Sequence, residues 1–197
     1  MSDPIKKGEP HHTYGEYCGW PEDQRWELID GVAYDMSPAP SRKHQALSME
    51  VSRQISNFLK GNPRRVYHAP FDVRLPAFFN QEDGEIDTVV QPDIVVVCNR
   101  EKLDERGCRG APDWVIEILS PHTLQKDLKV KSVLYGKHGV RELWFLHPID
   151  RSVMVFVLGP GGGYGRPRFY GPEDRVESSA VPGLTIDMKT AFEEAER

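Results

Sequence analysis

The segment PDWVIEILSP, residues 112–121, is an apolar run with a single glutamate in its middle. Its length, its β-branched and aromatic side chains and the Ser-Pro that closes it are typical of a buried central strand. Glu117 therefore carries a carboxylate into the core, where the loss of solvation is costly unless a partner compensates for it. The sequence around this strand must supply that partner.

The whole chain has the composition of a soluble globular protein. It has 197 residues, of which 39% are hydrophobic and 28% are charged. We expect residues 25–197 to form one domain, preceded by an N-terminal extension at residues 1–24. No apolar run reaches the roughly 20 residues that span a bilayer, and the polar N-terminus resembles no secretion signal. We therefore expect a cytoplasmic protein with no membrane partner.

The charge is unevenly distributed along an acidic chain of net charge -5. Residues 42–74 hold seven basic residues against two acidic ones, and residues 122–141 hold five against one. Each basic zone is either a surface for phosphate groups or an ordinary solvated helix face. The three cysteines have no CxxC spacing, which argues against a disulfide framework or a structural zinc site.

Turn and breaker residues divide the chain into strands and helices. Asp30-Gly31 predicts a hairpin turn within residues 25–37, and Ser41 predicts the N-cap of a helix that runs to about Lys60. The remaining expected elements are strands over 66–76, 88–98, 112–121, 142–148 and 152–159, a polar connection over 101–112, a helix from about Thr123 to His138, a hairpin over 169–179 and a terminal helix over 188–197. This order predicts an α/β (α+β) fold in which helices flank a central mixed β-sheet.

Two carboxylates fall on neighbouring strands of the predicted sheet. Asp93 precedes the apolar run at residues 94–97, about one loop before the strand of Glu117. Two such acids can hold a divalent cation through oxygen ligands, which would neutralise them and account for their burial. The sequence therefore indicates Asp93 and Glu117 as metal ligands, with Mg²⁺ as the expected ion and Mn²⁺ as an alternative.

Lys131 lies in the middle of an apolar helix face. At 100° per residue, four apolar or aromatic residues fall within about 60° of it: Leu124, Leu128, Leu134 and Tyr135. Asp127, four residues earlier, offers Lys131 a simple (i, i+4) ion pair. The alternative is that Lys131 reaches the carboxylate pair, where its ammonium would position a nucleophile and stabilise charge that develops on a phosphorane.

Four segments resemble, in order, the Uma-two family of putative restriction endonucleases, a branch of the PD-(D/E)xK nuclease superfamily. They are WELIDG…SPAPSRKH, QPDIVVV, PDWVIEILSPHT and KDLKVKSVLYGKHGVRELWFLHP, and the resemblance covers about residues 25–158. It implies a restriction-endonuclease-like core and metal-dependent hydrolysis of phosphodiester bonds in nucleic acid, with DNA as the expected substrate. It also implies a homodimer, since nucleases of this type often pair to cut two strands.

The resemblance assigns roles by position, with one departure. Asp93 resembles the Asp of the PD motif, and Glu117 resembles the acid of the (D/E)xK element. Two residues after that acid the superfamily has a lysine, whereas this chain has Leu119. In the Uma-like pattern a lysine moves to the following helix, where the D-x-x-x-K spacing matches Asp127 and Lys131.

Further residues match recurrent family positions or lie beside them. The resemblance implies a metal or water contact for Glu27 and a phosphate contact for His44. The alternatives are an ordinary hairpin charge for Glu27 and a helix N-terminal polar residue for His44. Arg42 and Lys43 belong to the same basic helix, so we expect them to bind the phosphate backbone of the substrate.

Three functions remain open from the sequence. The first is a Mg²⁺-dependent endonuclease in which Asp93, Glu117, Lys131 and Glu27 are catalytic. The second is a catalytically inactive nuclease-fold binding module, which Leu119 and the acidic net charge favour. The third is a structural sheet protein in which Glu117 simply pairs with Lys131.

Overall fold

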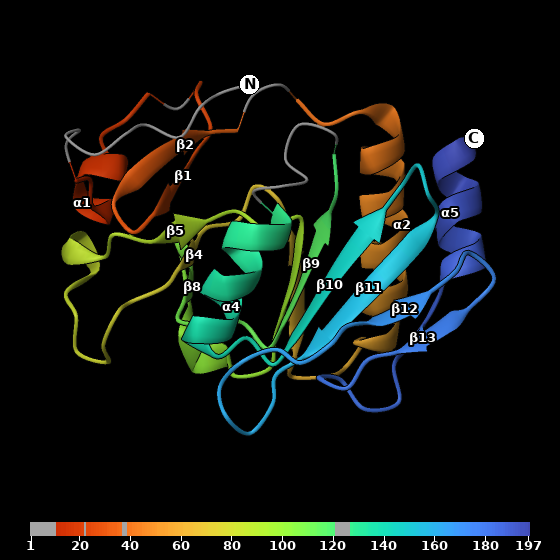
Figure 1. The fold of residues 1–197 in the computed structure, drawn as a ribbon. Helices are drawn as coiled ribbons and strands as arrows, with labels where there is room; N and C mark the ends of the chain where they lie inside the picture. The colour runs from red at the N-terminus through yellow and green to blue at the C-terminus, as the bar shows by residue number, and fades with distance from the viewer. Residues whose placement is uncertain (1–10, 22, 37–38, 121–126) are drawn as a thin grey trace.

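The computed structural model describes residues 11–21, 23–36, 39–120 and 127–197. These residues form two six-stranded sheets and one two-stranded sheet, with helices packed around them (Figure 1). The expected fold class, a mixed sheet flanked by helices, is confirmed.

The central sheet contains the strand of Glu117. Across the sheet its strands are β12 (Arg168–Tyr170), β11 (Ser152–Val157), β10 (Glu142–His147), β9 (Trp114–Ile118), β6 (Ile94–Val97) and β3 (Arg65–His68). β9 and β10 are parallel, and the other neighbours are antiparallel. All five residues of β9 are buried, because the strand has a neighbour on each side and a packed layer on each face.

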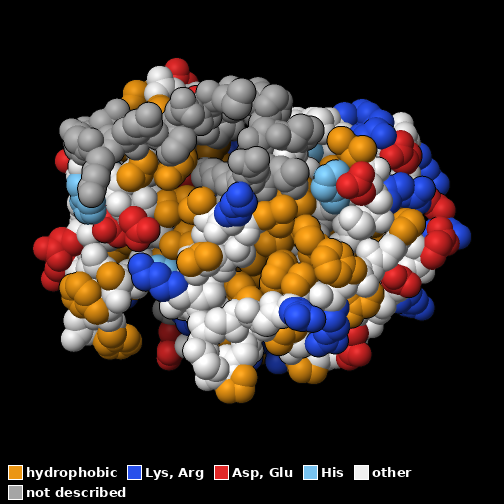
Figure 2. Space-filling model, in the orientation of Figure 1, with side chains coloured by type: hydrophobic (Ala, Val, Ile, Leu, Met, Phe, Trp, Pro, Cys, Tyr) orange, Lys and Arg blue, Asp and Glu red, His pale blue; other side chains and the backbone are white. Residues whose placement is uncertain are grey.

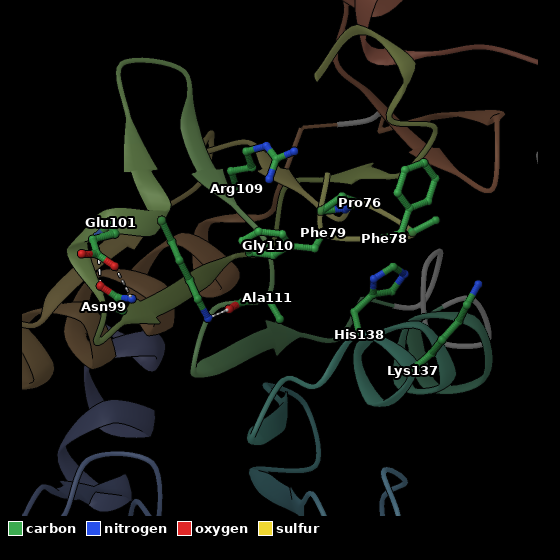
Figure 3. A pocket seen from close by; sticks show the side chains of 12 residues that line it. Pro76, Phe78, Phe79, Asn99, Glu101, Arg109, Gly110, Ala111, Lys137 and His138 are labelled. Carbon is green, nitrogen blue, oxygen red and sulfur yellow. Dashed lines mark hydrogen bonds between the residues drawn. The ribbon is translucent and has the colours of Figure 1, made fainter. Parts of the chain in front are cut away.

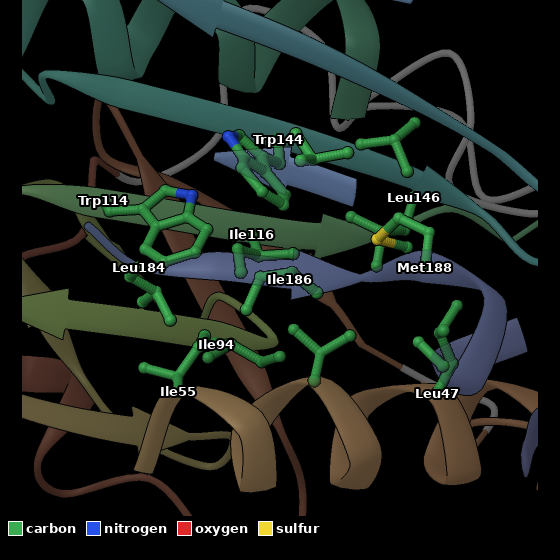
Figure 4. Packing of buried hydrophobic residues seen from close by; sticks show 14 of the residues in the cluster. Leu47, Ile55, Ile94, Trp114, Ile116, Trp144, Leu146, Leu184, Ile186 and Met188 are labelled. Carbon is green, nitrogen blue, oxygen red and sulfur yellow. The ribbon is translucent and has the colours of Figure 1, made fainter. Parts of the chain in front are cut away.

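Helices cover both faces of the central sheet. They are α2 (Arg42–Phe58) and α5 (Met188–Glu196) on one face and α4 (Ser132–His138) on the other. Figure 4 shows Ile55 of α2 directed toward Ile94 of the sheet, and Leu47 directed toward Met188 of α5. The residues that alternate with these along the strands, such as Val115 before Ile116, pack on the opposite face, against α4. Glu117 shares that side, because alternate residues of a strand face the same way.

The second six-stranded sheet packs beside α4. Its strands are β2 (Val32–Asp35), β1 (Trp26–Ile29), β5 (Val89–Val90), β4 (Val73–Arg74), β8 (Gly107–Arg109) and β7 (Leu103–Asp104). The predicted turn between β1 and β2 is confirmed, since Asp30 and Gly31 have φ angles of 48° and 78°. This turn brings β1, which carries Glu27, alongside β5.

Shorter elements complete the described chain. They are α1 (Tyr14–Tyr17), the 3₁₀ helices η1 (Asp83–Glu85) and η2 (Arg100–Lys102), the π-helical turn η3 (Asp127–Lys131), and the strands β13 (Arg175–Glu177) and β14 (Thr185–Asp187). No helix among the described residues combines the length and the apolar character that crossing a membrane requires.

Two strand predictions were wrong in the same way. The segments 66–76 and 88–98 each divide into two strands, and the two strands of each segment belong to different sheets. Pro70 and Pro92 lie at the divisions. Proline has no amide hydrogen to continue a ladder, so the chain leaves one sheet there and enters the other.

Two other local predictions also need correction. The polar connection over 101–112 contains the end of η2 and the short pair β7–β8. The hairpin over 169–179 does not form, because β12 pairs with β11 whereas β13 pairs with β14. The two helices α2 and α5 are confirmed, and Ser41 caps α2 by accepting a hydrogen bond from the backbone of His44. The first residues of the helix expected over 123–138, up to residue 126, lie outside the described residues.

Candidate active site

Glu117 meets a lysine in the core. Lys131 Nζ lies 3.0 Å from Glu117 Oε1 and 2.9 Å from Glu27 Oε1. The exposed fractions are 3% for Glu117, 4% for Lys131 and 1% for Glu27. One buried ammonium therefore joins two buried carboxylates that come from different sheets. These contacts offset the cost of burying Glu117, which the sequence left unexplained.

The π-helical turn η3 positions Lys131 beside the two carboxylates. Lys131 is the last residue of η3, directly before α4 begins at Ser132. A π turn inserts one residue into a helix and is frequent at functional sites. Leu134 and Tyr135 are buried on the same side, as the apolar face predicted. The side chain of Asp127 lies outside the described part of the chain, so the alternative pair between Asp127 and Lys131 stays a prediction.

A backbone amide fixes the orientation of Glu27. Glu27 lies on β1, and its Oε1 accepts a hydrogen bond of 3.1 Å from the amide of Gln91. The side-chain oxygen of Gln91 in turn accepts from Arg25, at 3.0 Å from the Nη2 atom. Gln91 lies in the crossover between β5 and β6, where the chain passes from one sheet to the other. Gln91 was not predicted as a site residue, and its position directly before Pro92 is the feature of the sequence that marks it.

Tyr135 is a second site residue that the sequence analysis did not identify. Its hydroxyl donates a 2.6 Å hydrogen bond to Glu117 Oε1, the same atom that Lys131 contacts. Burial raises the pKa of Tyr135 well above its usual range, so the hydroxyl keeps its proton and remains a donor. The spacing of four residues from Lys131 was the signal, since it places both side chains on one helix face.

Removing the Tyr135 hydroxyl has a measurable expected cost. We expect Tyr135→Phe to lower the free energy of unfolding by about 1.5–3 kcal/mol, the range for hydrogen bonds to charged groups. The ring stays in place, so no cavity adds to this loss. Urea denaturation measures the change, with Tyr170→Phe, at a half-buried position, as the control. Equal losses in the two variants would mean that the contact with Glu117 contributes nothing particular.

Asp93 lies next to the strand that carries Glu117. It directly precedes β6, whose first residue, Ile94, pairs with Ile116 of β9. The amide of Ile118 donates a 2.7 Å hydrogen bond to Asp93 Oδ2. The side chain of Asp93 is 19% exposed, against 4% for that of Glu117. The two expected metal ligands therefore lie on adjacent strands, and Asp93 is the one nearer to solvent.

His44 contacts Asp93 from the first turn of α2. Its Nε2 atom lies 3.2 Å from Asp93 Oδ2, and its side chain is 11% exposed. The Nδ1 atom is buried and has no hydrogen-bond partner among the described residues. His44 therefore contacts the carboxylate that we expect to bind metal. Its expected contact with phosphate stays a prediction.

Arg42 and Lys43 precede His44 in the same turn, and both contact the C-terminal helix. Lys43 Nζ lies 2.7 Å from a carboxylate oxygen of Glu196, and Arg42 donates to the backbone oxygen of that residue at 3.5 Å. The side chains of Lys43 and Glu196 are 44% and 48% exposed. Exposed ion pairs of this kind contribute little to stability. The binding of phosphate by Arg42 and Lys43 stays a prediction.

Comparison with known proteins places the chain in a family. A family model described as "Putative restriction endonuclease", Uma2, matches residues 13–189. The chain belongs to the Uma2 family. A relative is the "Uncharacterized protein slr1290" of Synechocystis sp., which is 26% identical over 147 residues, 74% of this chain and 70% of the relative.

A solved structure supports the Uma2 fold over almost the full chain. It is the crystal structure of "a putative nuclease belonging to DUF820" from Anabaena variabilis, with a TM-score of 0.73 and 25% sequence identity. The match covers 93% of this chain and 98% of that one. The nuclease-like architecture expected from the sequence is therefore shown, and the site described above lies within it.

The donor set of this Uma2 chain suits a hard cation. Among the described residues, no three His, Cys, Asp or Glu side chains are grouped so as to hold a metal ion by themselves. Mg²⁺ does not need such a group, because it commonly binds one or two carboxylates and keeps water and substrate phosphate as further ligands. Asp93 and Glu117 supply oxygen donors of the kind that Mg²⁺ prefers, and their joint binding of a metal ion stays a prediction.

Proposed function

We propose that this Uma2 protein is a Mg²⁺-dependent endonuclease that hydrolyses phosphodiester bonds of nucleic acid, with DNA as its substrate. The observation that carries the proposal is the meeting of Glu117, Glu27 and Lys131 in the core, with Asp93 on the adjacent strand. Buried charges of both signs in one place are typical of sites that carry out chemistry. The family and the solved structural neighbour, both described as nucleases, support the same reaction class.

Each site residue then has a distinct task. Asp93 and Glu117 would hold the metal ion, which when bound supplies Lewis-acid stabilisation of phosphate charge and lowers the pKa of a coordinated water. The Lys131 ammonium would donate to the attacking water or to a phosphate oxygen, where negative charge increases in the transition state. Glu27 fixes the position of that ammonium, and Tyr135 fixes the carboxylate of Glu117.

The first turn of α2 would receive the phosphate backbone. Arg42 and Lys43 present exposed basic groups there, and His44 next to them contacts Asp93. Phosphate contacts of this kind fix the register of the strand without reading its sequence. A homodimer belongs to the proposal, because two copies of the site would cut both strands of a duplex. Sedimentation analysis with and without duplex DNA tests that part.

Metal removal provides the direct test of the proposed function. We expect purified protein to cleave plasmid or single-stranded DNA with Mg²⁺ or Mn²⁺, to lose cleavage in EDTA, and to regain it when excess Mg²⁺ is added. The reason is that the two carboxylates alone cannot stabilise the charge on the phosphate. Cleavage that persists in EDTA would argue for a mechanism without metal.

A nuclease-fold binding module is the second candidate. Leu119 occupies the place of the usual lysine and is only 2% exposed, so it belongs to the core. Lys131 also contacts two carboxylates already, as expected for a structural ion pair. Binding of nucleic acid without any cleavage in Mg²⁺ or Mn²⁺ would favour this candidate.

A further inference from the structure

A cavity lies at the opposite end of α4 from Lys131. Its volume is about 640 Å³. Its lining comes from the loop at residues 76–79, from Asn99, Glu101 and Lys102, from residues 109–111, and from the end of α4. Figure 3 shows His138 extending from α4 toward the loop that carries Pro76 and Phe78, with Lys137 next to it on the helix. Figure 2 shows this face of the molecule hollowed at its lower left, beside a lobe that ends in hydrophobic side chains.

Two consecutive phenylalanines form an exposed wall of this cavity. Phe78 is 61% exposed and Phe79 is 90% exposed. Large aromatic side chains are rarely left in water side by side, and an exposed apolar patch at a cavity is typical of a binding site. Aromatic rings of this kind stack on nucleobases without regard to sequence, because every base has a flat π face.

The charged side chains of the remaining lining are mainly basic. The cavity contains Lys102, Arg109 and Lys137 against a single acid, Glu101. Lys102 donates to the backbone oxygen of Ala111 at 2.7 Å, and Arg109 is fixed by Asp83 at 2.7 Å. Bonds of this kind hold the two side chains in place before any ligand arrives.

His138 adds an unsatisfied polar atom. Its Nε2 atom is buried and has no hydrogen-bond partner among the described residues. Burial lowers the pKa of His138 below its usual value, which favours the neutral ring.

We propose that this cavity binds an unpaired nucleotide of the substrate strand, with its base against Phe78 and Phe79 and its phosphate toward Lys137. The proposal rests on the proposed nuclease function and names a single-stranded region as the preferred substrate. An aromatic wall combined with basic groups is the chemistry by which proteins bind single strands.

We expect one nucleic-acid strand to occupy both the candidate active site and the cavity. Lys131 and Lys137 are six residues apart in one helical segment, a rise of about 9 Å along the axis. Stacked nucleotides rise about 3.4 Å each, so two to three of them cover the axial distance. The strand must also turn about 120° around the helix, because Lys137 is exposed whereas Lys131 faces the core. Lys137 also lies 3.6 Å from Asp30, at the tip of the β1–β2 hairpin that carries Glu27. The end of α4 that lines the cavity therefore also contacts the hairpin that carries Glu27.

Binding of a fluorescein-labelled oligothymidylate, measured by anisotropy in EDTA, tests the proposal. We expect the double variant Phe78→Ala/Phe79→Ala to weaken binding by about 5- to 150-fold, the factor that follows from the loss of one base stack. Phe169→Ala is the matched control, because Phe169 is 68% exposed and lies outside the cavity. It should leave binding unchanged. An abasic probe should bind the native protein as weakly as the thymidylate binds the double variant.

The outcomes separate this proposal from the proposed function. Equal affinities of the native protein and the double variant for thymidylate would overturn the cavity proposal and leave the nuclease proposal intact. Tighter binding of a duplex, lost to the same degree in the double variant, would also overturn it. Cleavage in Mg²⁺ that does not depend on Asp93 would overturn the assigned site, whatever the double variant binds.

Discussion

Substitution of Lys131 by methionine is expected to lower the free energy of unfolding by about 3–5 kcal/mol, the cost of removing one partner from a buried ion pair. The variant leaves the carboxylates of Glu27 and Glu117 in the core without the ammonium that joins them. Methionine has a similar length, so lost packing contributes little. Urea denaturation measures the loss, and DNA cleavage should disappear as well.

A matched control and a second variant show whether charge causes this loss. Lys129→Met changes an exposed lysine two residues away and should alter stability by less than about 0.5 kcal/mol. Adding Glu27→Gln to Lys131→Met removes one of the stranded charges and should recover part of the stability, since directly contacting residues couple by about 0.5–3 kcal/mol. If Lys131→Met were as stable as the native protein, the two carboxylates would have to be neutralised by something other than Lys131.

Substitution of Asp93 by asparagine is expected to reduce Mg²⁺-dependent cleavage by about 10³-fold or more. A metal ion contributes several kcal/mol to transition-state stabilisation, and each 1.4 kcal/mol corresponds to about a factor of ten in rate. Asparagine keeps an oxygen that can accept the hydrogen bond from Ile118, so the fold should survive. Single-turnover cleavage measures the rate, and calorimetric titration with Mn²⁺ measures the loss of metal binding.

Asp150→Asn is the control for this second prediction. The side chain of Asp150 is 70% exposed and lies 3.4 Å from His147, so the substitution removes the same charge outside the proposed site. It should leave both cleavage and Mn²⁺ affinity unchanged. Full activity of Asp93→Asn would remove Asp93 from the metal site and with it the proposed mechanism.

Much of the fold follows from periodicity and turn chemistry, which are local. The apolar run around Glu117 predicts β9, and Ser41 with the helical spacing after it predicts α2. The helical face that contains Lys131 also predicts the side chain that reaches the carboxylates. In each case the information lies within one segment of sequence, so no knowledge of distant residues is needed.

The remaining features depend on contacts between distant segments. The division of residues 66–76 and 88–98 between two sheets depends on which partner strand is nearby, a matter that the apolar pattern does not record. The hydrogen bond from Tyr135 to Glu117 and the contact of His44 with Asp93 join elements that are separated in the chain. The cavity beside Phe78 combines three such segments, so composition alone gives no sign of it.

The placement of Lys131 on a helix makes the site adjustable in a way that a strand would not. An acid and a lysine two residues apart on one strand keep a constant separation, because a single rigid backbone holds both. Here the separation of Glu117 and Lys131 depends on how α4 and the π turn before it rest on the sheet. Lys137 and His138 line the cavity at the far end of α4. A ligand that binds there and shifts the helix would therefore also shift the Lys131 ammonium relative to the carboxylates.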